Sequence, residues 1–445
     1  MKLITKHFQG NSLKAQLLKG VTGSAGLKAA NTVLTMTTGV LLARTLGPEN
    51  YGVYAFVLSI VALLGLPTKA GLPTLIVRET AKNQLNGQWG LLRGLLTLAN
   101  GFVVVFSIVV ASVSALVVWW LWGTGESTKI QTFLWALWLL PLIAFGNIRS
   151  ATLRGLRRVV QGQLPEELVR PVIMIVLLAA ALVMDSELNP IQAIQYNVTA
   201  ALAAFGVGAF LLVKAMPQGV KNVRSEYEIK AWSLSLLPLS LFAGLKIADS
   251  QVAIVILGSL ASGEDVGFFR VAATGAGLVA FGLTSVNMAL APQVARLYSA
   301  GDIQKLQRVI TASTRAVLII SLPVALVFIL WGDVLIRLVF GAEYIPAATA
   351  LAILCIGQLV NTSSGSVALV LNMTGHDKET AKSIVVAMAI NVSLSLVLVP
   401  LYGLNGAAVS SAMSLTAWNL ILMRLTYKCT GLRTFAFSVQ AKEKK

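Results

Sequence analysis

The stretch Leu41-Leu-Ala-Arg-Thr-Leu-Gly-Pro-Glu-Asn-Tyr-Gly-Val-Tyr54 returns in altered form as Gly258-Ser-Leu-Ala-Ser-Gly-Glu-Asp-Val-Gly-Phe-Phe269. In both copies an apolar segment leads into a short turn that contains glycine, and Glu-x-x-Gly-x-aromatic opens the next apolar segment. Glycine suits such a turn because it has no side chain to forbid unusual backbone angles. The repeat predicts a chain built from two similar halves, a plan that recurs in membrane transporters.

The composition is that of a membrane protein. Of the 445 residues, 56% are hydrophobic and only 12% are charged, far from the usual balance of a soluble domain. The expected fold class is therefore an all-α integral membrane protein. A helix needs about 20 apolar residues to cross roughly 30 Å of hydrocarbon. Apolar run lengths predict about 12 transmembrane helices, near residues 22–45, 52–74, 92–122, 132–150, 171–184, 193–215, 234–257, 269–292, 314–332, 347–372, 383–400 and 405–427.

The longest polar connector separates the two halves. It begins at Met216 and ends at Lys230. We expect an N-terminal six-helix bundle over residues 1–216, a cytoplasmic connector over 217–233, and a C-terminal six-helix bundle with a short cytoplasmic tail over 234–445. An even number of spans in each half gives the two halves the same orientation in the membrane. An axis along the membrane normal would then relate the halves, and a substrate cleft would lie between them. The polar stretch 161–167 is predicted to be a cytoplasmic linker.

The net charge of +17 is first a topology signal, because cytoplasmic loops collect Lys and Arg. With the predicted spans, 28 of the 35 basic residues fall on the N-terminal side of the membrane. Both termini are therefore expected in the cytoplasm, in a multi-pass protein of the bacterial cytoplasmic membrane. Attraction to acidic lipid accounts for the charge, so no nucleic acid partner is expected. The segment before Val21 lacks the apolar run of a signal peptide.

Cofactor and metal chemistry have no support in the sequence. Cys355 and Cys429 do not form a CxxC motif or a Cys/His metal spacing. The Gly-x-x-x-x-Gly-Lys-Ser/Thr motif that cradles nucleotide phosphates is also absent, so direct driving by ATP is unsupported. We expect no metal and no cofactor.

Lys28, Lys246 and Asp249 are ionisable residues within predicted spans, where each charge costs about 2.5–3.5 kcal/mol on insertion scales. Lys246 lies near the middle of the seventh span and is the strongest candidate for contact with an anionic substrate. Asp249 is three residues later, so it could pair with Lys246 structurally or provide a proton or Na⁺ site. Lys28 begins a polar stripe on the first span; it either faces a cavity or extends to the lipid head groups.

Three further cations complete the candidate cationic cavity. Lys69 lies within Gly65-Leu-Pro-Thr-Lys-Ala-Gly-Leu-Pro-Thr74, where two prolines and two glycines predict a break in the second span. Arg44 and Arg270 flank the two copies of the repeated turn. For all three, a position at the membrane interface is the favoured interpretation.

The repeated stretch, the segment Gly71-Leu-Pro-Thr-Leu-Ile-Val-Arg-Glu-Thr-Ala81 and the segment Tyr402-Gly-Leu-Asn-Gly-Ala-Ala408 together resemble Wzx-type polysaccharide and O-antigen flippases of the multidrug/oligosaccharidyl-lipid/polysaccharide exporter superfamily. The resemblance implies two six-helix bundles around a V-shaped central cavity. It also implies translocation of polyprenyl-diphosphate-linked oligosaccharide to the outer leaflet by alternating access, with H⁺ or Na⁺ as coupling ion. Implied partners are the lipid-linked oligosaccharide, membrane lipids, a polysaccharide polymerase and a chain-length regulator.

Lysines or arginines from both halves would offset the desolvation of a diphosphate, which agrees with this resemblance. Two transport alternatives stay open: a flippase for lipid-linked peptidoglycan precursors, and a multidrug or cation antiporter. The antiporter is less favoured, since the spans contain more Lys than Asp or Glu. An enzyme is not expected, because every predicted outer loop is short and both His7 and His376 fall in predicted cytoplasmic segments.

Overall fold

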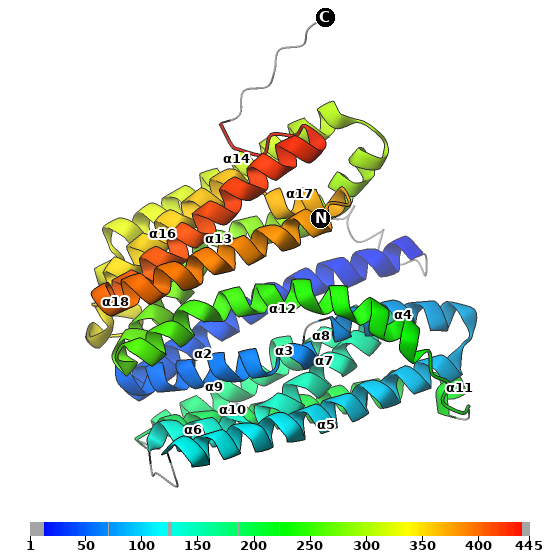
Figure 1. The fold of residues 1–445 in the computed structure, drawn as a ribbon, viewed down its shortest axis with the longest axis horizontal. Coiled ribbons are helices and arrows are strands. Elements are labelled where there is room, and N and C mark those ends of the chain that lie inside the picture. The colour runs from blue at the N-terminus through cyan, green and yellow to red at the C-terminus, as the bar shows by residue number, and fades with distance from the viewer. Residues whose placement is uncertain (1–12, 70, 123–126, 185–186, 222, 438–445) are drawn as a thin grey trace, which may run out of the picture. The chain divides into compact units, whose positions relative to one another are not determined.

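A computed structural model describes residues 13–69, 71–122, 127–184, 187–221 and 223–437. Within these residues the regular structure is entirely helical (Figure 1). In this described part of the chain, nine helical stretches are long and apolar enough to cross a membrane. The predicted class, an all-α multi-pass membrane protein, is confirmed.

Every predicted span overlaps one or more helices of the described chain; the span 171–184 corresponds to α9 (Arg170–Val183), which is not among the nine. The first half contains α2 (Leu13–Leu64), α3 (Leu66–Lys69), α4 (Leu72–Asn86), α5 (Trp89–Trp122), α6 (Thr128–Ala136), α7 (Leu139–Gly155), α8 (Val159–Leu164), the π-helix η2 (Pro165–Val169), α9 (Arg170–Val183), α10 (Pro190–Ala215) and α11 (Gln218–Lys221). The second half contains α12 (Ile229–Leu260), α13 (Gly263–Ser299), α14 (Ile303–Leu330), α15 (Gly332–Val339), the 3₁₀ helix η3 (Ala342–Tyr344), α16 (Ala347–Ser364), α17 (Val367–Met373) and α18 (Asp377–Thr430).

Helices α2 and α18 each correspond to two predicted spans. They contain 52 and 54 residues, far more than the 20 or so that cross a bilayer. Each is interrupted at one glycine with non-helical backbone, Gly47 (φ 70°, ψ 172°) and Gly403 (φ 51°, ψ −126°). A positive φ is costly for residues with a Cβ, which explains glycine at both breaks. Each half therefore contains one pair of spans joined at a glycine break.

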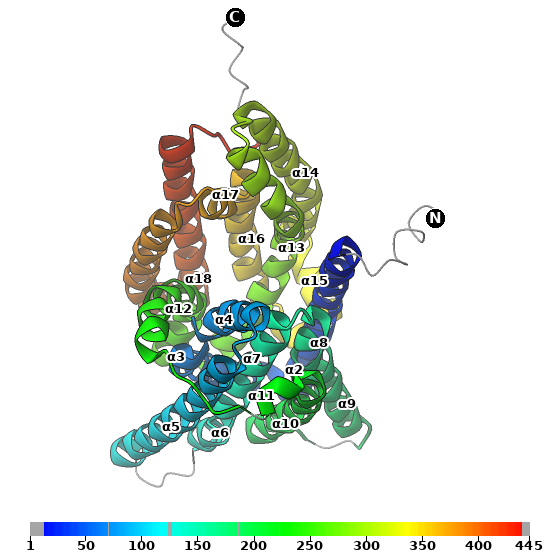
Figure 2. The same ribbon diagram turned by 90° about the vertical axis from the view of Figure 1, so that its right-hand side faces the viewer.

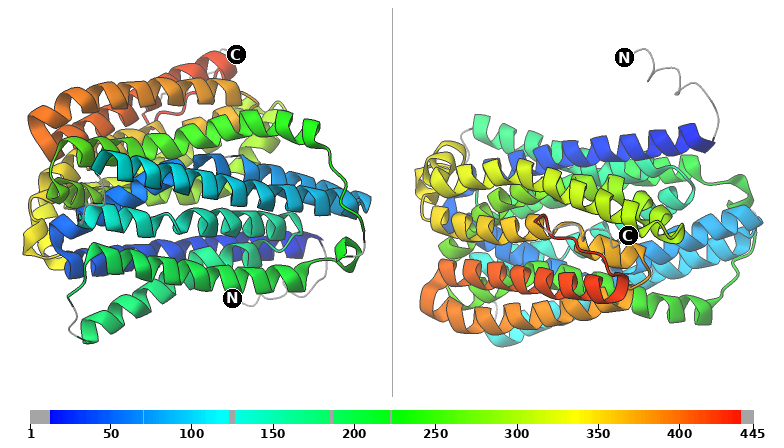
Figure 3. Two further views of the ribbon diagram at one scale, coloured as in Figure 1. Left: turned by 60° about the horizontal axis from the view of Figure 1, so that its bottom comes forward. Right: turned by 90° about the horizontal axis from the view of Figure 1, so that it is seen from above.

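The chain forms two compact units. Unit 1 comprises residues 1–46 and 57–247, and unit 2 comprises residues 47–56 and 248–445. The predicted bundles, by contrast, are separated at the connector 217–233. Two segments account for the difference: the first part of α12 groups with unit 1, and the turn at residues 47–56 groups with unit 2. Within each unit the long helices run roughly parallel or antiparallel (Figure 3).

The two copies of the repeated turn both belong to unit 2, where they pack against one another. A Cβ added to Gly52 would overlap the carbonyl oxygen of Gly263, and one added to Gly267 would overlap that of Pro48. In the repeat, Gly267 occupies the place of Gly52 and Gly263 the place of Pro48. The contact is thus reciprocal, and close backbone approach explains why both motifs have glycine.

The predicted linker at residues 161–167 is wrong. The chain turns only at Leu156–Arg158, where Arg157 has a positive φ of 63°, and is then helical from Val159 to Val183 through α8, η2 and α9. Run-length prediction excluded this segment because it contains Glu166 and Glu167. Polar partners from other helices of unit 1 surround these two residues, so the charges are accommodated within a helix.

Candidate functional site

A cluster of charged side chains surrounds Glu166 and Glu167 inside unit 1. The Nη1 of Arg170 lies 3.3 Å from Oε2 of Glu166, one turn away on the same helix. Lys28 and Arg154 are close enough to interact electrostatically with Glu167. We call the set the charged network; its members are Lys28, Lys69, Arg149, Arg154, Glu166, Glu167 and Arg170.

The π-helix η2 positions the two carboxylates. Its wide turn closes with the N–H of Arg170 donating to the carbonyl of Pro165, five residues earlier. A π-turn inserts one extra residue into the helix and is frequent at functional sites. Asn31 of α2 donates its side-chain amide to the Glu167 carbonyl at 3.0 Å. The irregular turn is therefore anchored to the first helix.

Arg149 is the most deeply buried member of the network, with 8% of its surface exposed. Its Nε donates to the Phe145 carbonyl at 3.1 Å, and its Nη1 donates to the carbonyl of Phe205. The guanidinium carbon lies 3.6 Å from the centroid of the Phe205 ring, a cation–π contact. Its Nη2 is buried and makes no hydrogen bond to any residue that the structure describes.

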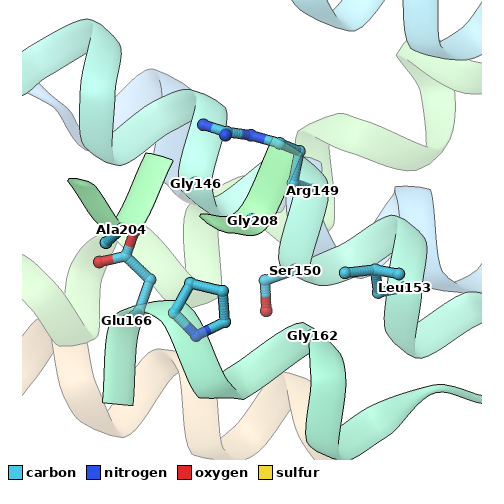
Figure 4. A pocket seen from close by; sticks show the side chains of 9 residues that line it. Gly146, Arg149, Ser150, Leu153, Gly162, Glu166, Ala204 and Gly208 are labelled. Atoms are coloured by element: carbon cyan, nitrogen blue, oxygen red, sulfur yellow. The ribbon is translucent and has the colours of Figure 1, made fainter. Parts of the chain in front are cut away.

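A small cavity separates Arg149 from Glu166 (Figure 4). Its volume is about 10 Å³, and Ser150 and Gly208 also line it. That space is close to the minimum for one water molecule. A Cβ on Gly146 would meet Oε1 of Glu166, so the glycine leaves room for the carboxylate.

Two contacts connect α2 and α3 to the same network. Ser24 Oγ donates to the side-chain oxygen of Gln163 at 2.6 Å, which holds α2 beside α8 (Figure 2). Lys28, one turn further along α2, is exposed and interacts with Glu167. Lys69 ends α3 at the predicted helix break, which is present, and interacts repulsively with Arg170. Two candidate lysines from distant parts of the sequence therefore meet near the π-helix.

The network carries more positive than negative charge, with five Lys or Arg side chains against two carboxylates. Cations within a membrane protein are costly unless they are paired or lie in a wet cavity. Lys69 and Arg170 repel one another, and Arg149 has an unsatisfied nitrogen, so internal pairing leaves positive charge uncompensated. An anion such as a diphosphate would provide that compensation.

The other cationic candidates lie outside this network. Arg44 in α2 and Lys246 in α12 are exposed residues of unit 1. Arg270 belongs to unit 2 and donates a side-chain hydrogen bond to Tyr51 in the repeated turn. The Tyr51 ring contacts that of Tyr344, with centroids 6.4 Å apart. Arg270 therefore has a structural partner.

Asp249 lies in a neutral polar environment of unit 2. Its carboxylate accepts a hydrogen bond from the amide of Asn391 in α18, and its Oδ1 is buried without a partner among the described residues. Asn391 Oδ1 in turn accepts from Ser395 at 3.2 Å. Asp249 takes part in none of the ion pairs between described residues. A carboxylate with one free oxygen beside a side-chain amide is suited to hold a proton or a small cation.

Sequence reasoning missed Arg149, Arg154, Glu166, Glu167 and Arg170 as members of the site. The sequence predicted these residues to lie in a cytoplasmic linker or beside it. Their charges were interpreted only as a sign of which side of the membrane the segment faces. Two signals were available: charges spaced three and four residues apart at 166, 167 and 170, which share a helix face, and Pro165, which suits the start of a helical segment.

A family model and two flippases are similar to this chain in sequence. The family described as polysaccharide biosynthesis protein matches residues 41–349. The chain is 26% identical over 197 residues to the probable low-salt glycan biosynthesis flippase Agl15 of Haloferax volcanii, covering 44% of this chain and 40% of that protein. It is 22% identical over 182 residues to the probable flippase AglR of the same organism, covering 40% and 38%. Each match spans less than half of the relative's length.

Solved transporter structures share the fold. An inward-facing MATE family multidrug transporter of the MOP superfamily superposes with a TM-score of 0.76 at 14% identity, covering 89% of this chain and 94% of that chain. The lipid II flippase MurJ in an inward closed conformation gives a TM-score of 0.71 at 13% identity, covering 90% and 87%. At these identities the similarity shows the fold alone.

These relatives and structures are flippases and transporters, which confirms the expectation that the chain is not an enzyme. No group of three or more His, Cys, Asp or Glu suited to a metal occurs in the described part of the chain. The family match covers 309 consecutive residues, well over half of the sequence, and includes the first copy of the repeated turn, the π-helix and the whole of unit 1 after Leu41. The chain therefore belongs to the polysaccharide biosynthesis protein family and has a fold similar to that of the MATE and MurJ transporter structures.

Proposed function

We propose that this protein is a flippase that moves a polyprenyl-diphosphate-linked oligosaccharide from the inner to the outer leaflet of the cytoplasmic membrane by alternating access. The family, the flippase relatives and the shared transporter fold support this class of function. Both termini would lie in the cytoplasm, as the distribution of Lys and Arg predicts. The glycan would be an O-antigen or another surface polysaccharide repeat unit, which a polymerase with a chain-length regulator would then extend.

The observation that carries the proposal is the positive charge of the charged network. A diphosphate must leave water to cross a membrane, which costs free energy because its charges lose their hydration. Cations in a low-dielectric region offset that cost. Arg170 and Arg149 offer planar guanidinium groups, whose geometry suits phosphate oxygens. Lys28 is exposed, so its ammonium can meet the head group first. A cationic drug would instead find repulsion here.

Ion coupling is assigned in this proposal to Asp249. Its free carboxylate oxygen lies beside the Asn391 amide, which the Ser395 hydroxyl holds in turn, and would bind H⁺ or Na⁺. Occupation of that site would bias unit 2, whereas the diphosphate would act on unit 1. Arg44, Lys69, Lys246 and Arg270 remain proposed contributors to the cationic surface that the substrate meets.

The test is leaflet accessibility of a fluorescent polyprenyl-diphosphate oligosaccharide in proteoliposomes. We expect the wild-type protein to accelerate flipping and Lys28→Ala to reduce the rate by about tenfold or more, the loss expected when a charge-assisted contact of about 1.5–3 kcal/mol is removed. Lys214→Ala is the matched control, because Lys214 is exposed and lies outside the network. Absence of acceleration with any lipid-linked glycan, for a well-folded protein, would contradict the proposal.

A lipid-linked peptidoglycan precursor is the second candidate substrate. It carries the same diphosphate and would find the same compensating charge in the network. Presenting both lipid-linked head groups to the same proteoliposomes separates the two, because the substrates differ in the group attached to the diphosphate.

A further inference from the structure

An apolar groove on unit 1 lies outside the charged network. It has a volume of about 490 Å³ and is lined by α5 on one side and by α6 and α7 on the other. Ligand pockets typically measure about 300–1,000 Å³, so the groove is large enough for part of a lipid. Figure 2 shows α5 and α6 neighbouring one another at the side of unit 1 away from α8 and α9.

The groove exists because α5 and α7 separate partway along their length. Their shared hydrophobic core ends at Val103 on α5 and Ala144 on α7. Pro141 lies near the start of α7 and has no N–H to donate to the Leu137 carbonyl, so the helix is interrupted just before it. On the N-terminal side of this interruption, α6 forms the wall of the groove. Helix α5 packs closely along α7 but not along α6. The two walls therefore diverge.

Small side chains on α5 form one side of the groove. Ser107, Ala111 and Ala115 are spaced four residues apart and so share a helix face. Larger residues, Ile108 on α5 and Trp138 beside α7, line the groove and are 60% and 64% exposed. The lining of α5 extends from Val104 to Ala115, so the groove is an elongated slot of about 16 Å, the rise of eleven helical residues.

The chemistry of the lining restricts the occupant. No charged residue lines the groove, and its polar side-chain atoms are the hydroxyls of Ser107 and Ser112 and the indole N–H of Trp138. An anionic or sugar group would therefore lose its hydration without recovering hydrogen bonds. An extended hydrocarbon chain satisfies both the length and the polarity of the slot.

Phe145 joins the groove to the charged network. Its side chain lines the groove, while its carbonyl accepts from Nε of Arg149 at 3.1 Å. Its ring also meets that of Phe205 edge to face at 6.2 Å, and Phe205 lies beneath the Arg149 guanidinium. One end of the apolar slot is thus a single helical turn from the Arg149 guanidinium, whose Nη2 has no hydrogen-bond partner among the described residues.

We propose that this groove binds the isoprenoid chain of the lipid-linked substrate while the diphosphate lies toward the charged network. The inference rests on the proposed function and adds where the hydrocarbon part of the substrate is held. Because the bilayer is itself apolar, the groove must gain its selectivity from packing and shape rather than from the hydrophobic effect.

The experiment is photo-crosslinking of the full-length protein in lipid nanodiscs. The probe is a polyprenyl diphosphate with a diazirine on its terminal isoprene unit, and a diazirine-bearing phospholipid serves as the second probe. Ala111→Phe fills the slot. Val113→Phe adds the same ring on the exposed face of α5, outside the groove, and is the matched control.

We expect the polyprenyl probe to label peptides of α5 and α7 in the wild-type protein and in Val113→Phe. Labelling there should fall by about threefold to tenfold in Ala111→Phe, as expected when packing contacts of one side chain are lost. Equal labelling in Ala111→Phe and Val113→Phe would overturn the inference. So would groove labelling by the phospholipid that excess polyprenyl diphosphate does not displace, because the site would then hold bulk lipid.

The flipping assay separates this inference from the proposed function. If the wild-type protein flips the lipid-linked glycan but Ala111→Phe does not reduce labelling of α5 and α7, the assignment of the groove is wrong. The proposed flippase function is then unaffected. If the wild-type protein flips no lipid-linked glycan, the function itself fails whatever the labelling pattern.

Discussion

The two units differ in how their interiors handle polarity. Unit 1 holds charges: Glu79 and Arg149, the charged residues that are buried in the described part of the chain, both belong to it. Unit 2 buries neutral groups that bond to one another, such as Asn419 to Asn361 at 3.2 Å and Trp418 to Ser383 at 3.0 Å. Two halves with one repeated motif have thus acquired different interiors. The difference supports the proposal that the anionic part of the substrate is recognised in unit 1, and the same proposal assigns ion coupling to Asp249 in unit 2.

The largest loss of stability is expected from breaking the Arg170–Glu166 ion pair of unit 1. Arg170→Met removes the partner of a half-buried carboxylate and leaves Asn197 without its 2.9 Å hydrogen bond from Arg170. Breaking an internal pair on one side costs about 3 kcal/mol where burial is deep, and we expect about 1–3 kcal/mol here. Thermal unfolding in detergent measures it, and Arg170→Met combined with Glu166→Gln should recover part of the loss. A single variant as stable as the wild type would refute the internal role of the pair.

The second effect concerns the reciprocal turn contact of unit 2. Gly267→Ala places a Cβ against the Pro48 carbonyl and should lower stability by about 1–3 kcal/mol. Gly277→Ala is the control on the same helix, because a Cβ there meets open space. The control should gain up to about 1 kcal/mol from helix propensity. Equal responses of the two variants would show that the turns do not need glycine for close packing.

Asp249→Asn tests the role assigned to unit 2. The amide keeps the size of the side chain but cannot bind or release a proton, so flipping should lose its dependence on a pH or Na⁺ gradient. Binding of the diphosphate lipid should stay within about twofold of wild type, since Asp249 is not part of the charged network. Unchanged gradient dependence, measured in proteoliposomes with imposed gradients, would exclude Asp249 as the coupling residue.

The smallest effect is expected at an exposed ion pair of unit 2. Lys382 lies 2.8 Å from Glu379, but the two side chains are 72% and 32% exposed. Exposed pairs contribute about 0–1 kcal/mol, so Lys382→Met should barely change the melting temperature. A loss as large as that of Arg170→Met would remove the contrast between internal and surface pairs.

Much of the fold follows from local sequence. The helices appear where apolar runs predict them, and the break near Lys69 follows from two prolines and two glycines. The repeated Glu-x-x-Gly-x-aromatic motif indicated a duplication, but not that the two turns pack on each other. That contact depends on which distant segments meet, which a single sequence does not specify.

The site could be predicted only in part. Lys28 and Lys69 stand out because a lone cation in an apolar run is costly. Glu166 and Glu167 do not stand out, because two adjacent carboxylates within a polar stretch are also what a solvent-exposed loop contains. Their helical placement depends on partners far along the chain, since the hydrogen bond from Asn31 to the Glu167 carbonyl spans 136 residues. Neither the length of an apolar run nor the periodicity of the sequence indicates such long-range partners.

The most direct test of the central claim compares cations of the two units. Binding of a polyprenyl diphosphate to the purified protein would be measured for the wild type, for Lys28→Gln with Lys69→Gln in unit 1, and for Arg308→Gln with Arg337→Gln, two exposed residues of unit 2. Recognition by the charged network predicts a loss of affinity of about tenfold or more for the unit 1 pair and a change within about twofold for the unit 2 pair. Equal losses, or a larger loss for the unit 2 pair, would contradict it.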